Sequence, residues 1–536
     1  MGIPSYFSHF VRQHRNIIKQ ITLLNKPINN LYLDCNAFIY DGVNNNRINM
    51  NEDILIKFVC DKLIYYISLL KPNKKVFIAF DGVAPVAKLN QQRKRRYLSW
   101  YQSNLVKSQS AHDNKDIWNT SAITPGTLFM DKLAEKIKKR FNNAKEFGLE
   151  EFIISCADEV GEGEHKIFSY IRDNAEYHRD SNTVIYGLDA DLIMLTLSHL
   201  SISKNLYLFR ETPEFIKSVD NTLNPNELYL LDIPEFGKRI IFDFSVSELF
   251  DVNINTYSFK EEDFHKINDY IFIFFLLGND FMPHFPSINI RTNGIEILIN
   301  AYKECINSKN LFLTDGDKII WKNLRSFIEY LSLNELGNIK HEYSSREKHK
   351  VYNKKPLTLE KEIETKLINL PMTDRFSEQY INPNEFGWET RYYRILFDIS
   401  SKEEERIKEI CVNYLEGLEW TYRYYKSNCV DWRWTYKYDY PPLLVDLIKY
   451  IPYFDFHYFL EKKTLPVTPI VQLSYVLPKQ SLYLISNNFD KILLKEKPEW
   501  YVNDCEFQWA FCKYFWESHV KLPEIDIAHL ENLITV

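Results

Sequence analysis

The 536-residue chain lacks several features by which common protein classes are recognised. It contains no stretch of about 20 uncharged apolar residues, so no membrane-spanning helix is predicted. Its eight cysteines include no Cys-x₂-Cys pair, which excludes a zinc ribbon and a thioredoxin-like site. Basic residues are not in excess: the net charge is −6, so any nucleic-acid binding must depend on a local patch. Scattered single cysteines without a signal peptide predict a cytoplasmic protein.

Alternating elements dominate the first 300 residues. Short β-rich runs at 31–36, 76–80, 151–156, 183–188 and 206–210 are separated by amphipathic segments such as 49–70. Residues 131–147 and 163–174 are also expected to be helical. This alternation predicts an α/β fold with a mostly parallel sheet covered by helices on both faces.

The remainder of the chain has a different character. Residues 336–375 are charged and lack clear periodicity, which favours a surface connection between two regions. Beyond them, residues 376–536 are rich in aromatics, with helical pieces and turns marked by proline. We therefore expect residues 1–335 to form one core and residues 376–536 a helical, aromatic-rich second region.

Acidic residues repeatedly follow the hydrophobic runs or a glycine turn. Buried carboxylates are costly unless they are paired or bound to a cation, and a set of oxygen ligands favours Mg²⁺ or Mn²⁺. A single acid of this kind is more often a helix cap or turn residue, but the whole set is hard to explain that way. Two clustered ions are typical of phosphodiester chemistry. The candidate metal-binding and catalytic acids are Asp34, Asp81, Glu162, Glu164, Asp189, Asp191 and Asp280.

The expected geometry brings these acids together. Loops that follow the carboxyl ends of parallel strands converge on one crevice. The i, i+2 spacing of Asp189 and Asp191 directs both side chains the same way if the strand continues through them. His165, directly after Glu164, is expected to be structural rather than a ligand, because the site is rich in oxygen.

A basic segment follows Asp81 closely. Residues 88–96 contain five cations and two glutamines, and on a helix Lys88, Gln92, Arg95 and Arg96 fall near one face. Guanidinium and amide donors on one face are suited to bind a phosphate. A solvated basic helix is the plainer alternative. Next to the acids, the segment predicts recognition of a terminal phosphate beside the cleavage site.

Longer motifs around these residues carry a family resemblance. MGIPSYF, FDGVAPVAKLNQQRKRRY, VGEGEHKI, IYGLDADLIML and FLLGNDFMPHFP resemble signatures of the Xrn-type 5′→3′ exoribonucleases. YLEGLEWTYRYY, WRWTYKYDYPP and PIVQLSYVLPKQS are similar to that family's second conserved region. The resemblance implies a nuclease core related to PIN domains and flap endonucleases, clasped by the second region.

The resemblance also implies roles for individual residues. The seven acids would bind two Mg²⁺ or Mn²⁺ ions, and Lys88, Gln92, Arg95 and Arg96 would form a 5′-phosphate pocket too narrow for a cap or triphosphate. The family stacks the terminal base between a histidine, whose position Tyr40 occupies here, and a tryptophan, which could be Trp432 or Trp434. The implied partner is single-stranded RNA with a 5′-monophosphate, degraded processively to mononucleotides, with functional coupling to a decapping enzyme.

This sequence departs from the family pattern at a few positions. Tyr40 replaces the histidine, Val86 replaces a common arginine, and Val160 replaces a proline before the Gly-Glu-Gly-Glu turn. No expected metal ligand is lost. The chain ends where the family core ends, so we expect a compact, monomeric, core-only member, of viral origin and acting in the host cytoplasm. A structure-specific DNA 5′ nuclease and a catalytically idle RNA-binding protein are the alternative interpretations.

Overall fold

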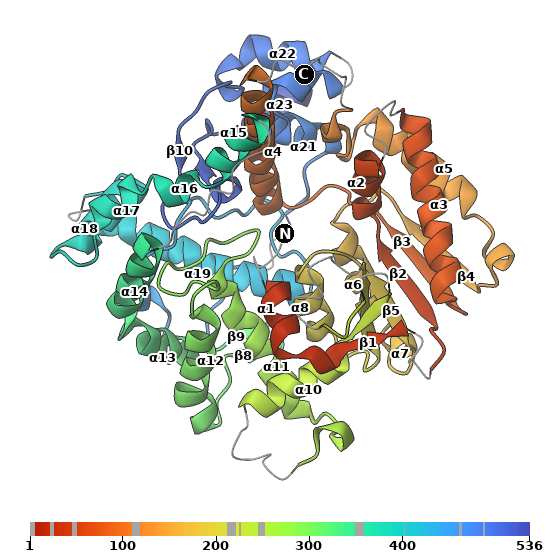
Figure 1. Ribbon diagram of the computed structural model, residues 1–536, viewed down its shortest axis with the longest axis horizontal. Helices are drawn as coiled ribbons and strands as arrows, with labels where there is room; N and C mark the ends of the chain where they lie inside the picture. The colour runs from red at the N-terminus through yellow and green to blue at the C-terminus, as the bar shows by residue number, and fades with distance from the viewer. Residues whose placement is uncertain are drawn as a thin grey trace.

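The computed structural model describes most of the chain (Figure 1). The described residues are 6–21, 26–45, 51–109, 118–211, 221–224, 227–244, 252–348, 359–400, 403–459, 464–485 and 488–535. None of the helices within these ranges is both long and apolar enough to span a bilayer.

A seven-stranded sheet organises the N-terminal half. The strands are β1 (Ile18–Gln20), β2 (Asn30–Asp34), β3 (Lys75–Ala79), β4 (Glu151–Ser155), β5 (Thr183–Tyr186), β6 (Leu206–Arg210) and β7 (Tyr229–Asp232). Their spatial order is β1-β7-β6-β5-β2-β3-β4. The five neighbouring strands β6, β5, β2, β3 and β4 are parallel to one another. At one edge of the sheet, β7 pairs antiparallel with both β6 and β1. The five strands expected from the β-rich runs and the mostly parallel sheet are confirmed.

Both faces of the sheet are buried, as the near-continuous apolar runs of its strands require. Leu31 and Leu33 of β2 point into a core shared with α3 (Glu52–Leu70) and α5 (Leu128–Arg140). The alternate residue Tyr32 points into the other core, which α6 (Gly163–Asp173) and α8 (Asp191–Ser198) cover. Helices on both sides therefore hold the central strands, and the strand ends are fixed in position.

The second half of the chain is mainly helical and packs against the second of these cores. Helices α19 (Glu404–Lys426) and α11 (Glu261–Phe274) both contact α8 (Figure 1). The two halves of the chain therefore share one hydrophobic interior. The other α-helices are α1 (Tyr6–Gln13), α2 (Asn36–Asn45), α7 (Ala175–His178), α10 (Ile233–Phe244), α12 (Gly294–Cys305), α13 (Trp321–Ser332), α14 (Glu335–Lys348), α15 (Leu359–Ile368), α16 (Leu370–Thr373), α17 (Phe376–Ile381), α18 (Trp388–Phe397), α20 (Leu444–Tyr450), α21 (Pro469–Val476), α22 (Phe489–Glu496) and α23 (Ile527–Thr535). Two short hairpins pair β8 (Thr314–Asp315) with β9 (Lys318–Ile319) and β10 (Phe507–Gln508) with β11 (His519–Val520).

Helix α4 (Val86–Gln109) connects the two halves and carries the basic segment. Its first residue, Val86, donates a backbone hydrogen bond to the carbonyl of Trp432. Further along, Arg93 donates to the carbonyls of Trp500 and Pro523, and Lys94 pairs with Asp439. Two of the five cations of this segment are thereby used to attach the second region to the core.

Two local expectations differ from the structure. The helix expected over 131–147 ends at Arg140, and residues 144–147 form a separate 3₁₀ turn. The segment 336–375 contains most of α14, together with α15 and α16, while residues 349–358 lie outside the described residues. The domain boundaries stay a prediction.

Candidate active site

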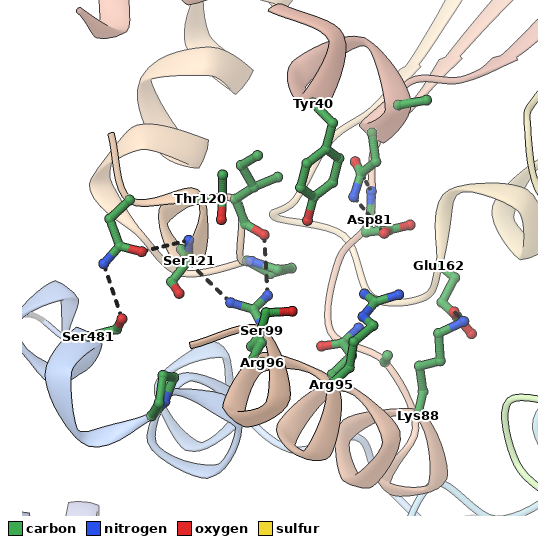
Figure 2. Close-up of a pocket in the computed structure, with 18 of the residues that line it drawn as sticks. Tyr40, Asp81, Lys88, Arg95, Arg96, Ser99, Thr120, Ser121, Glu162 and Ser481 are labelled. Atoms are coloured by element: carbon green, nitrogen blue, oxygen red, sulfur yellow. Dashed lines mark hydrogen bonds and ion pairs between the residues drawn. The ribbon is translucent and has the colours of Figure 1, made fainter. Parts of the chain in front are cut away.

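A pocket of ≈ 800 Å³ opens where the parallel strands β2, β3 and β5 end (Figure 2). Acidic side chains form one end of it, and the basic face of α4 forms an adjoining wall. Five of the seven expected acids line it: Asp34, Asp81, Glu162, Glu164 and Asp189. All four residues expected to bind phosphate line it too: Lys88, Gln92, Arg95 and Arg96. Asp191 and Asp280 are not among its lining residues.

Strand ends place the acids at the pocket. Asp34 is the last residue of β2 and is paired in register with Ala79, the last residue of β3. Asp81 lies two residues beyond the end of β3, the strand adjacent to β2. Gly163 begins α6 directly against them: a Cβ atom there would lie 2.7 Å from Asp34 Oδ1. Only glycine permits this approach, which explains the Gly-Glu-Gly-Glu turn.

The carboxylate of Asp81 is oriented by two donors. Asn36 Nδ2 donates to Oδ2 at 2.5 Å, and the backbone N–H of Gly163 donates to Oδ1 at 2.7 Å. The second donor lies at the N-terminus of α6, where the helix dipole favours negative charge. The sequence interpretation did not identify Asn36, although its position two residues after Asp34 was the signal available.

Glu162 connects the acids to both the basic helix and the helical region. Lys88 Nζ lies 2.6 Å from its Oε2 and 2.8 Å from Oδ2 of Asp280. The hydroxyl of Tyr424, on α19, donates to its Oε1 at 2.8 Å. Tyr424 was also not foreseen, because it lies 262 residues away in the sequence. Lys88 thus pairs with two buried acids and places a positive charge within the acidic cluster.

Ionisation of the acids is strongly perturbed. Burial, together with the charges of Asp81 and Asp189, raises the pKa of Asp34 well above its usual value. Burial and the Asp191 charge do the same to the pKa of Glu164. Asp280 differs, because the Lys88 ammonium outweighs the effect of burial and lowers its pKa. With Lys88 as the nearest cation, burial and mutual repulsion therefore oppose the ionised form of Asp34 and Glu164.

The unpaired oxygens of the cluster show where additional positive charge fits. Asp34 Oδ1, Glu164 Oε2 and Asp191 Oδ1 are buried without a hydrogen-bond partner. Buried acceptors are normally satisfied, and carboxylate oxygens are the donors that Mg²⁺ and Mn²⁺ prefer. No group of three or more acidic, histidine or cysteine side chains among the described residues is arranged to hold a metal ion. The donor chemistry fits a divalent ion, whereas in this arrangement Lys88 pairs with only two of the acids, Glu162 and Asp280.

Asp189 and Asp191 do not share one face of a strand. Strand β5 ends at Tyr186, and the chain then turns into α8, which begins at Asp191. Asp189 is exposed on the turn and lines the pocket, whereas Asp191 is buried below it. The expectation of parallel side chains is wrong because the strand stops before both residues.

Arg95 and Arg96 of α4 form the basic wall of the pocket. Arg95 is exposed, and no carboxylate of the described residues pairs with it or with Arg96. Arg96 donates to the carbonyls of Ser121 and Ile123 over 3.4 Å each, while its buried Nε has no partner. Burial lowers the pKa of Arg96 to about 10, so it is still charged at neutral pH. Figure 2 shows Arg95 and Arg96 on this wall, separate from Lys88 near Glu162.

The expected base-stacking residues are not assembled around the pocket. Tyr40, on α2, lines it and is 40% exposed. Trp434 is buried and stacks on Trp420, with ring centroids 5.2 Å apart. Trp420 stacks in turn on Tyr424 at 4.8 Å. Trp432 is half-buried, and neither it nor Trp434 lines the pocket.

His165 ends this column of rings. Its imidazole stacks on Tyr424 at 3.7 Å, and burial lowers its pKa well below the usual value. A neutral ring in van der Waals contact with Tyr424 agrees with the structural role expected for it.

Comparison with protein families identifies two regions of the chain. Residues 1–212 match the model described as the XRN 5′-3′ exonuclease N-terminus. Residues 261–379 and 360–535 match the Xrn1 helical domain. These two models together cover most of the chain: the first contains every strand of the seven-stranded sheet except β7, and the second lies in the mainly helical part.

Curated proteins of the same kind are similar over nearly the whole chain. 5′-3′ exoribonuclease 1 of Saccharomyces cerevisiae is 25% identical over 93% of this chain and 40% of its own length. The 5′-3′ exoribonuclease 2 homolog of Drosophila melanogaster is 26% identical over 98% of this chain and 70% of its own length. Human 5′-3′ exoribonuclease 1 is 27% identical over 98% of this chain. The chain spans 33% of the human protein, so that relative contains extensive additional sequence.

Proposed function

Because the chain belongs to the XRN 5′-3′ exonuclease family, we propose that it is a Mg²⁺- or Mn²⁺-dependent, processive 5′→3′ exoribonuclease. Its substrate is RNA with a 5′-monophosphate, as left by decapping, and its products are mononucleotides. The observation that carries this proposal is the single pocket that joins the acids at the strand ends to the guanidiniums of α4.

Recognition of the 5′ end sets the register of cleavage. Lys88, Gln92, Arg95 and Arg96 line the same pocket and bind the terminal phosphate, and Lys88 also pairs with Glu162 and Asp280. The first phosphodiester is then presented to the carboxylates one nucleotide away. An internal phosphate is esterified to a nucleotide on each side, so it cannot bind to Arg95 and Arg96 in the same way as a terminal phosphate. This difference accounts for cleavage from the 5′ end.

The seven acids would hold the divalent ions, with Asp34, Asp81, Glu162, Glu164 and Asp189 at the pocket surface and Asp191 and Asp280 behind them. When bound, such ions activate a water and neutralise charge on the scissile phosphate. Asn36 and Gly163 hold the Asp81 carboxylate in place, and Tyr424 holds that of Glu162. Preorganised carboxylates lower the cost of reorganisation during the reaction.

Base stacking and partners complete the proposal. Tyr40 provides a ring at the pocket, and of the two tryptophans Trp432 is the more accessible for stacking against the terminal base. Stacking contributes about 1–3 kcal/mol per base and tolerates any sequence, which suits processive decay. We further propose that the protein acts as a monomer in the cytoplasm and is functionally coupled to a decapping enzyme.

One assay tests the function. Purified protein is given matched RNAs that end in 5′-monophosphate, triphosphate or hydroxyl, together with single-stranded and flap DNA, in Mg²⁺ or EDTA. We expect mononucleotides to be released rapidly only from monophosphorylated RNA and only with Mg²⁺. Preferred cleavage of flap DNA would establish the DNA 5′ nuclease instead, and binding of RNA without cleavage would establish the idle binding protein.

Two variants locate the activity. Asp191→Ala tests the acidic cluster, and retained activity in it contradicts the metal-site assignment. Arg95→Ala tests the phosphate wall, the side of the pocket formed by Arg95 and Arg96 of α4. We expect this variant to lose the preference for RNA with a 5′-monophosphate over RNA with a 5′-hydroxyl. Rapid release of mononucleotides from triphosphate RNA by the unmodified protein contradicts the assignment of the pocket.

A further inference from the structure

Tyr40 occupies a position from which its ring and its hydroxyl can act separately. It lies on α2, the helix that follows Asp34 at the end of β2, and it is one of the pocket-lining residues. Its side chain is 40% exposed, and no aromatic ring among the described residues stacks on it. Neither Trp432 nor Trp434 lines the pocket opposite it.

The hydroxyl of Tyr40 is directed toward the phosphate wall. In Figure 2 the phenol oxygen points from α2 across the pocket toward the region of Arg95 and Arg96, rather than toward Glu162. Tyr40 and Arg96 both line this pocket. The side chain therefore faces the cations from the opposite side of the pocket.

The groups around this space lack an anionic partner. No carboxylate of the described residues pairs with Arg95 or Arg96, and the buried Nε of Arg96 is unsatisfied. Two guanidiniums approached by one neutral hydroxyl donor form a complementary set for a dianionic phosphate. A phenol hydroxyl has one O–H that can donate to a phosphate oxygen.

We propose that the Tyr40 hydroxyl donates a hydrogen bond to the 5′-phosphate of the RNA and thereby contributes to selectivity for phosphorylated 5′ ends. This inference rests on the proposed function, because it extends the same 5′-phosphate pocket. The ring of Tyr40 remains able to stack on the terminal base, since the hydroxyl and the ring face are different surfaces of one side chain. Tyr40 is then a specificity-determining residue through an atom that stacking does not use.

Tyr40→Phe separates the two roles, because it keeps the ring and removes the hydroxyl. Initial rates are measured on matched 5′-monophosphate and 5′-hydroxyl RNAs, and inhibition by adenosine 5′-monophosphate is measured in parallel. A hydrogen bond to a charged group corresponds to at least about tenfold in affinity. We expect Tyr40→Phe to raise KM for phosphorylated RNA and Ki for the nucleotide about tenfold, with kcat and the rate on hydroxyl RNA unchanged.

Tyr483→Phe is the matched control. Tyr483 also lines the pocket, but its hydroxyl accepts a hydrogen bond from Asn119 at 3.1 Å. We expect this variant to leave the ratio of rates on the two RNAs unchanged. Thermal unfolding of both variants verifies that each is folded.

The possible results are distinguishable. If Tyr40→Phe equals the unmodified protein on both RNAs, or is slowed equally on both, the hydroxyl does not bind phosphate and the inference is overturned. If the unmodified protein shows no preference for phosphorylated RNA, the proposed function fails first. Tyr40→Ala adds the contribution of the ring: a loss on both RNAs that Tyr40→Phe does not show supports separate roles for ring and hydroxyl.

Discussion

The hydroxyl of Tyr424 donates a 2.8 Å hydrogen bond to Oε1 of Glu162, and both side chains are buried. One residue comes from the helical region and the other from the N-terminus of α6, beside the pocket. Tyr424 is itself held between the rings of Trp420 and His165. The helical region thus does more than cover the core, since it determines the orientation of an acidic side chain at the pocket.

We expect Tyr424→Phe to lower kcat about tenfold with KM nearly unchanged, because Glu162 loses the donor that orients it. The buried acceptor is left unsatisfied, which costs about 1–3 kcal/mol of stability. Tyr422→Phe is the control: two residues earlier on α19, Tyr422 donates to the carbonyl of Gly316, away from the acids. The two variants should lose similar stability in urea denaturation, and equal loss of kcat in both contradicts an orienting role.

Replacement of Asp34 should separate activity from stability. Burial and the neighbouring carboxylates raise its pKa, so its charge opposes folding when no divalent ion is present. We expect Asp34→Asn to lose at least about 10²-fold in activity while gaining on the order of 1 kcal/mol of stability in EDTA. Thermal unfolding with and without Mg²⁺ checks this. A variant that is less stable than the unmodified protein in EDTA contradicts it.

Much of the fold could be predicted from the sequence because its signals are local. Each strand of the central sheet is an apolar run, and Asp34 directly follows such a run. The ends of parallel strands converge for geometric reasons, so the grouping of Asp34 and Asp81 followed without knowledge of any distance.

The parts of the site that depend on long-range packing could not be predicted. Tyr424 meets Glu162 across 262 residues, and no local pattern distinguishes it from its neighbouring aromatic residues. The basic run that contains Lys88 predicts that this residue binds phosphate. In the structure Lys88 lies in the first turn of α4, next to the acids, and pairs with Glu162 and Asp280. The direction of the Asp191 side chain depends on where β5 ends. Because β5 ends at Tyr186 and α8 begins at Asp191, this side chain does not point the same way as that of Asp189.

Glu335 provides a pH-dependent contribution outside the pocket. It is buried, accepts hydrogen bonds from the backbone N–H groups of Leu444 and Val445, and burial raises its pKa to about 7. The folded state therefore holds this proton at pH values where the unfolded state has lost it. Stability from this group is complete below about pH 4.5 and is lost as pH rises toward 7, by at most about 3 kcal/mol.

The variant Glu335→Gln tests whether the carboxyl group of Glu335 causes this pH dependence of stability. The amide stays uncharged, and one of the two N–H groups loses its acceptor, which costs about 1 kcal/mol at every pH. Urea denaturation between pH 4.5 and 7.5 should show that the stability of the unmodified protein falls relative to that of the variant as pH rises. A constant difference across this range would mean that Glu335 titrates normally.

The last prediction concerns Lys88, which pairs at 2.6 Å with Glu162 and at 2.8 Å with Asp280. Lys88→Met leaves two buried carboxylates unpaired, and removing one partner of a buried pair costs about 3–5 kcal/mol. Added Mg²⁺ supplies the missing positive charge if the acids bind it, so it should raise the melting temperature of this variant more than that of the unmodified protein. Lys94→Met is the control, because Lys94 lies on the same helix as Lys88 and makes one half-buried ion pair, with Asp439. We expect that variant to lose at most about 1 kcal/mol and to gain no more from Mg²⁺ than the unmodified protein. Equal responses of the two variants to Mg²⁺ would separate Lys88 from the metal-binding acids.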